Sequence, residues 1–115
     1  MILGSFYFRH TSSGNLVGEF MNQLSERAAT ESADFRREMI NGNMEYQSTW
    51  FDISGGKMRL EISPKPGSHN IFRFVWSEGN TQQFIGEAFL SDGIYIGVYW
   101  DGFLDEKLNG LLEKK

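Results

Sequence analysis

Few of the 115 residues have the chemistry of a catalytic or metal site. The chain has no cysteine, which excludes disulfides, thiolate ligands and a cysteine nucleophile. Its two histidines, His10 and His69, have no partner at metal-ligand spacing. The serines fit no G-x-S-x-G pattern, and Asp105 and Glu106 are adjacent, so they would point apart on a helix. We therefore expect no catalytic residue, no metal and no cofactor. An enzyme remains a third interpretation, which would require two or more titratable groups in one cleft.

The aromatic side chains are the stronger candidates for a functional site. Aromatic residues make up 15% of the chain, and in a small β domain they serve either as core or as the stacking surface for a ring-bearing ligand. Ser48 is the first candidate for a polar group that would orient such a ligand, with Arg73, Gln83 and Glu87 as further ones. The candidate ligand-binding residues are Tyr46, Ser48, Trp50, Phe74, Trp76 and Trp100.

Short strands are the elements that would have to position these side chains. Turn-forming segments rich in Gly, Asn, Asp and Ser recur along the chain, and the runs between them alternate with period two. The run 57–63 is the clearest case, because Met58, Leu60 and Ile62 share one face. The predicted strands are 2–10, 15–22, 29–37, 43–53, 57–63, 70–77, 82–91 and 93–100.

The segment 15–41 permits two interpretations. Its apolar residues recur at spacings of three and four, which favours a helix and would give an α+β domain with that helix packed on a curved antiparallel sheet. Two strands agree better with the rest of the chain, because SGNLVGEF starts from a turn as SDGIYIGVY does. We favour the strands.

The end of the chain predicts one short helix. Phe103, Leu104, Leu108 and Leu111 fall on one stripe, and Asp101 is a suitable N-cap. We expect 102–114 to close the domain by packing over an edge or a barrel mouth. The whole chain, 1–115, is then one all-β domain, an eight-stranded antiparallel up-and-down barrel. Such a barrel is filled by side chains or holds one small ligand.

Gly18, Gly86 and Gly97 lie inside predicted strands, each next to bulky residues. A glycine inside a strand marks a bend, a bulge or a close approach by a neighbour. We expect these glycines to let strongly coiled strands turn a barrel corner or to accept an aromatic ring from the adjacent strand.

The segments SGNLVGEF (13–20), EYQSTW (45–50), FIGEAF (84–89) and IYIGVYW (94–100) together resemble small calycin-type barrels of the avidin and lipocalin kind. The resemblance is one of pattern over about 90 residues, and it is closest to a bacterial family of this shape. It implies an eight-stranded barrel with tryptophans lining an interior ligand. The dense polar set of an avidin-like site is missing, so the resemblance does not imply biotin binding.

Charge and composition exclude some partners. The net charge of −4 and the scattered basic residues argue against nucleic acid. No apolar run reaches the length of a membrane-spanning helix, and the start of the chain does not have the pattern of a signal peptide, so we expect a cytoplasmic protein without a membrane partner.

The leading function is non-enzymatic binding of a small, largely apolar ligand in the barrel interior. The alternative is a protein-interaction module of the immunity or inhibitor type that uses an exposed sheet face. A homo-oligomer is compatible with both.

Overall fold

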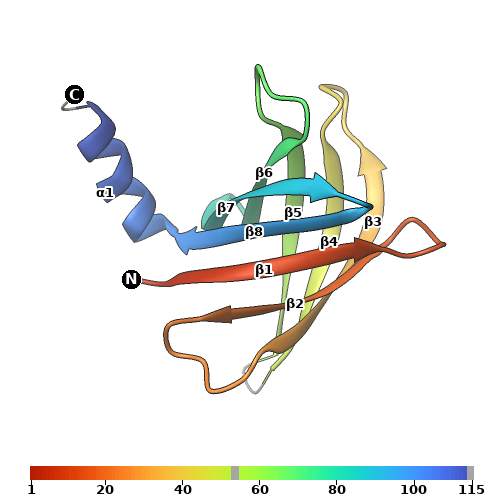
Figure 1. Ribbon diagram of the computed structural model, residues 1–115, viewed down its shortest axis with the longest axis horizontal. Coiled ribbons are helices and arrows are strands. Elements are labelled where there is room, and N and C mark those ends of the chain that lie inside the picture. The colour runs from red at the N-terminus through yellow and green to blue at the C-terminus, as the bar shows by residue number, and fades with distance from the viewer. Residues whose placement is uncertain (53–54, 114–115) are drawn as a thin grey trace.

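The computed structural model describes residues 1–52 and 55–113, and it shows a closed antiparallel barrel followed by one helix (Figure 1). Each strand pairs with the next in sequence, and β8 returns to pair with β1, so the order is up-and-down as predicted. The elements are β1 (Leu3–His10), β2 (Leu16–Asn22), β3 (Ala29–Glu38), β4 (Met44–Phe51), β5 (Gly56–Pro64), β6 (Ile71–Glu78), β7 (Thr81–Ser91), β8 (Ile94–Asp101) and α1 (Gly102–Glu113).

The segment 15–41 forms two strands, so the helical alternative is wrong. Leu16 is buried and Phe20 half-buried on the inner face of β2, whereas Met21 is 49% exposed on the outer face. Leu24 lies beyond the strand and is 74% exposed. The residues that would have formed one helical stripe therefore lie in different environments, and the period-two alternation decides the structure. Residue 53, the last of the predicted strand 43–53, lies outside the described residues.

Inward-facing aromatic and aliphatic side chains fill most of the barrel. Phe8 and Phe74 are fully buried and stack with a centroid distance of 6.2 Å and an interplanar angle of 6°. Tyr95 packs edge-on against Phe74 at 5.2 Å. Leu16, Leu60 and Ile62 are buried beside these rings and belong to the same core cluster. The half of the interior that holds these residues is a packed core.

The atoms around Gly97 and Gly86 explain why neither position carries a side chain. A Cβ at Gly97 would lie 2.2 Å from the carbonyl oxygen of Glu87 and 2.7 Å from the Cβ of Ala88. A Cβ at Gly86 would lie 2.7 Å from the carbonyl oxygen of Val98, with the rings of Phe6 and Trp76 at 3.2 and 3.3 Å. The expected approach of aromatic rings is thus confirmed at Gly86, whereas at Gly97 the neighbouring strand itself is close.

Helix α1 starts directly after β8. The side chain of Asp101 accepts a hydrogen bond from the backbone N–H of Leu104 at 2.9 Å, which confirms the expected N-cap. Its other carboxylate oxygen accepts one from the N–H of Ile2, also at 2.9 Å, and so ties the start of the chain to the end of β8. The helix contacts β7 and β8 and then extends away from the barrel (Figure 1). Position 114 of the predicted helix lies outside the described residues.

No helix formed by residues 1–52 and 55–113 is long and apolar enough to cross a membrane.

Candidate functional site

A carboxylate lies inside the barrel. Glu31 is the third residue of β3 and is only 4% exposed. Its register partners are Gly18 on β2 and Trp50 on β4, so the strand directs its side chain inward, in phase with the fully buried Ala33. Gly18 has no side chain, and none would fit, because a Cβ there would lie 1.7 Å from the carbonyl oxygen of Tyr7 on β1.

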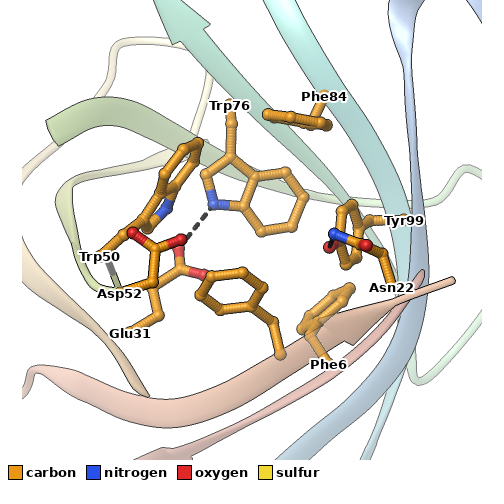
Figure 2. Close-up of a pocket in the computed structure, with 9 residues that line it drawn as sticks. Phe6, Asn22, Glu31, Trp50, Asp52, Trp76, Phe84 and Tyr99 are labelled. Atoms are coloured by element: carbon orange, nitrogen blue, oxygen red, sulfur yellow. Dashed lines mark hydrogen bonds between the residues drawn. The ribbon is translucent and has the colours of Figure 1, made fainter. Parts of the chain in front are cut away.

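Neutral donors surround this carboxylate. The Nε1 of Trp76 donates a hydrogen bond to Glu31 Oε2 at 2.8 Å, and the hydroxyl of Ser48 donates a short one to the same oxygen. Figure 2 shows the Trp76 indole pointing at the Glu31 carboxylate, with the Trp50 indole on the same side of the cavity. Both donors come from strands other than β3, since Ser48 lies on β4 and Trp76 on β6.

Burial raises the pKa of Glu31 from its ordinary 4.5 to about 7, because removal of the carboxylate from water disfavours its charged form. Hydrogen bonds from Ser48, Trp76 and Trp50 act in the opposite direction and limit the rise. The group therefore changes its charge near neutral pH, unlike an ordinary surface glutamate.

Glu31 lines a cavity of about 110 Å³ that is partly open to solvent. The cavity lies at the end of the barrel where β2, β4 and β6 end and where β7 begins, as the positions of Asn22, Trp50, Trp76 and Phe84 on their strands show. Most of its lining is aromatic (Figure 2). The lining residues are Phe6, Phe20, Asn22, Glu31, Trp50, Asp52, Trp76, Phe84 and Tyr99.

Two further titratable groups share the cavity with Glu31. Asp52 follows β4, and its Oδ1 accepts a hydrogen bond from the N–H of Gly55 at 2.9 Å. Tyr99 is buried on β8, and its hydroxyl accepts a hydrogen bond of 3.1 Å from the Asn22 amide. Burial raises the pKa of Tyr99, and the negative charges of Glu31 and Asp52 raise it further. Three groups that exchange protons thus line one cavity, which is the arrangement required by the enzyme interpretation.

The structure brings half of the predicted ligand-binding residues to this site. Trp50 and Trp76 line the cavity, and Ser48 lies behind it, bonded to Glu31. Tyr46 and Phe74 face the interior as expected but belong to the packed core. The ring of Tyr46 also meets that of the partly exposed Phe35 edge to face, with centroids 5.6 Å apart.

Trp100 is not part of the interior. Because Tyr99 points into the cavity, its neighbour must face outward, and the Nε1 of Trp100 donates a hydrogen bond of 2.9 Å to Asp105 of α1. Two of the other polar candidates also lie outside the barrel. Glu87 forms an ion pair with Lys65, whose Nζ lies 2.8 Å from its Oε1, and Arg73 is exposed.

Sequence reasoning did not single out Glu31, although the alternation of residues in its predicted strand indicates that its side chain faces inward. On the strand interpretation of 29–37, Glu31 alternates in phase with Ala29, Ala33 and Phe35, opposite Thr30, Ser32 and Asp34. A lone carboxylate on the apolar face of an amphipathic strand indicates a buried functional or structural charge.

The described residues do not provide a metal centre. Within 1–52 and 55–113, no group of three or more His, Cys, Asp or Glu side chains is placed to hold an ion. The arrangement can instead bind a small ring-bearing molecule between aromatic walls, accept hydrogen bonds from it, and exchange a proton with it near neutral pH.

No protein-family model, curated protein or solved structure matches the chain.

Proposed function

We propose that the protein is a non-enzymatic binding protein that takes up a small, largely apolar, ring-bearing ligand at the end of its barrel. The observation that carries the proposal is the cavity of about 110 Å³, in which aromatic walls surround a few buried polar groups. Ligand sites in proteins usually combine an apolar lining with a small number of polar groups that fix the orientation of the ligand.

The size of the cavity limits the ligand. The cavity is small, because Tyr46 and Phe74 belong to the packed core and fill the barrel instead of lining the space. A dry protein cavity of about 150 Å³ holds a benzene molecule. The present cavity is smaller, at about 110 Å³, but it is partly open to solvent, so we expect it to take at most a single ring, with any short substituent extending through the opening.

The resemblance to calycin-type barrels of the avidin and lipocalin kind, and to a bacterial family of that shape, supports the same function. Those barrels hold a ligand in the interior with tryptophans near the strand ends. Trp50 and Trp76 occupy such positions here, close to the ends of β4 and β6. A cytoplasmic location remains part of the proposal on the sequence grounds given above.

The alternative function, a protein-interaction module, is favoured by one outer surface. Phe89, Ile96 and Val98 on β7 and β8 are 46%, 42% and 48% exposed and line a shallow apolar depression. These side chains do not specify a partner, whereas the cavity combines apolar walls with a buried carboxylate. We therefore place the function in the cavity.

An acid–base enzyme is the other candidate, because Glu31, Asp52 and Tyr99 converge on one cavity. The two functions differ in the fate of the ligand. A ligand recovered chemically unchanged after prolonged incubation with the protein supports binding, and a converted ligand supports the enzyme.

Benzyl alcohol tests the proposal as a neutral probe of the right size. Titration into the protein should change the tryptophan fluorescence, since two indoles line the cavity. Two variants of the same strand separate the cavity from the outer surface: Phe84→Ala removes a cavity wall, and Phe89→Ala removes an outer ring. We expect Phe84→Ala to weaken binding severalfold and Phe89→Ala to leave it unchanged. Weakening by Phe89→Ala alone would overturn the proposal.

A further inference from the structure

We infer that the ligand carries a positive charge, and that the barrel end is a site for a small aromatic amine whose ammonium group lies beside Glu31. The inference rests on the proposed function and adds the charge class of the ligand. Three features of the cavity carry it: the signs of its charges, the polar partners of its buried carboxylate and the aromatic character of its walls.

The charges of the cavity are of one sign. Its lining contains two carboxyl groups, those of Glu31 and Asp52, and no lysine, arginine or histidine among the described lining residues. Glu31 itself takes no part in the ion pairs Met1–Asp101, Arg37–Glu45 and Lys65–Glu87. An ionised carboxylate in an apolar surrounding is costly without a cation, and an anionic ligand would add a second charge of the same sign.

The hydrogen bonds to Glu31 are all from neutral donors. Ser48 and Trp76 bind its Oε2, and neither neutralises the charge. An ammonium group that enters the cavity would supply the missing positive charge and up to three N–H donors. This arrangement differs from a purely structural buried glutamate, which is usually paired with a cation inside the protein.

The aromatic walls favour the same ligand. Six of the lining residues are aromatic, namely Phe6, Phe20, Trp50, Trp76, Phe84 and Tyr99. Trp50 and Phe84 meet edge to face with centroids 5.8 Å apart, and Phe84 and Tyr99 do so at 5.7 Å. An aromatic ring attracts a cation at its face, so a site lined by six aromatic side chains suits a cationic ligand better than an anionic one.

Binding of a cation should be linked to the proton on Glu31. The titratable groups that face it are Asp52 from the end of β4 and Tyr99 from β8. Both are neutral or negative, so neither competes with a cation. A cationic ligand stabilises the ionised form of Glu31, and its affinity should therefore fall as the pH is lowered through the pKa of about 7.

Three probes of nearly equal shape test the charge class: benzylamine, benzyl alcohol and benzoate. We expect benzylamine to bind about tenfold or more tightly than benzyl alcohol at about pH 8, and benzoate to bind least. If all three fail to bind, the proposed function itself fails. If benzyl alcohol binds as tightly as benzylamine, the cavity binds ligands but the inference about charge is overturned.

Glu31→Gln tests the carboxylate directly, since it removes the charge and keeps the shape. Its matched control is Glu78→Gln, which makes the same change of net charge at an exposed position in β6, next to the β6–β7 turn at the same end of the barrel. Glu31→Gln should lose the preference for benzylamine over benzyl alcohol, and Glu78→Gln should retain it. An unchanged preference in Glu31→Gln would overturn the inference.

The unmodified protein provides a test that does not depend on the folding of a variant. Below pH 7 the affinity for benzylamine should fall by about tenfold for each pH unit, while that for benzyl alcohol stays nearly constant. Parallel pH profiles for the two probes would contradict a charge-based site.

Discussion

Trp76 and Glu31 are joined across the inside of the barrel by a hydrogen bond of 2.8 Å between Nε1 and Oε2. The two residues are 45 positions apart in sequence and lie on β6 and β3, which are not neighbours in the sheet. A buried charge is thus held by a side chain that also forms a wall of the cavity. Changes at either residue should affect both stability and binding.

Glu31→Gln should make the protein more stable than the parent at neutral pH. The pKa of Glu31 is raised in the folded state, so the unfolded chain releases this proton first as the pH rises from 4.5 to about 7. The folded state then binds more protons than the unfolded state, and stability falls with pH across that window. The difference between the two pKa values corresponds to a loss of about 3 kcal/mol, complete above about pH 7.

Urea unfolding of both proteins between about pH 4.5 and 8 measures this difference. All other residues are common to both proteins, so their contribution to the pH dependence cancels in the comparison. The advantage of Glu31→Gln should grow with pH. An advantage that is constant or shrinks with pH would contradict the raised pKa.

Ser48→Ala should destabilise the protein by about 1–3 kcal/mol, because it removes a donor from a buried acceptor. The same change should raise the pKa of Glu31 further, since the Ser48 hydroxyl lowers it. Chemical denaturation and a carboxyl NMR titration measure the two effects. Ser5→Ala, an exposed position on β1, is the matched control and should change stability by less than about 0.5 kcal/mol. Equal effects of the two variants would argue against the Ser48–Glu31 bond.

Gly97→Ala should destabilise the barrel by about 1–3 kcal/mol, because the new methyl group would meet backbone and Cβ atoms of β7 at less than 3.0 Å. Gly110→Ala is the control, a glycine-to-alanine change at a position that has room for a side chain. Its Cβ would meet nothing within 4 Å, and alanine is favoured over glycine in a helix by about 1 kcal/mol. Thermal unfolding should therefore show a lower Tm for the first variant and an equal or higher Tm for the second.

Trp100→Phe should leave ligand binding intact. The Trp100 indole lies outside the barrel and bonds to Asp105, so its loss affects the contact with α1 but not the cavity. The benzylamine affinity of this variant, measured by fluorescence of the remaining indoles, should equal that of the parent protein. A loss of affinity would place Trp100 at the site after all.

The fold could be predicted from the sequence because its signals are local. Alternation such as Met58, Leu60 and Ile62 fixes which face of a strand is buried, and glycine-containing turns fix where strands end. The same reasoning correctly placed Trp50 and Trp76 on inward faces. It chose the wrong face of 94–100, because it placed Trp100 at the site, whereas Tyr99 packs against interior rings such as that of Phe84 and Trp100 bonds to Asp105 of α1.

The centre of the site depends on long-range placement, which a single sequence does not specify. Glu31 obtains its partners from β4 and β6, and its environment follows from barrel closure. The sequence also did not specify how much of the interior is filled. The packing of Phe74 against Phe8 and Tyr95 in the core arises from strands far apart in the chain.

The indole N–H signals of the three tryptophans provide the most direct test of a binding site built around Glu31. In a nitrogen-15 NMR spectrum recorded during titration with benzylamine, the signals of Trp50 and Trp76 should shift together and saturate, while that of Trp100 stays in place. A spectrum in which none of the three signals moves, or in which only Trp100 responds, would contradict the account.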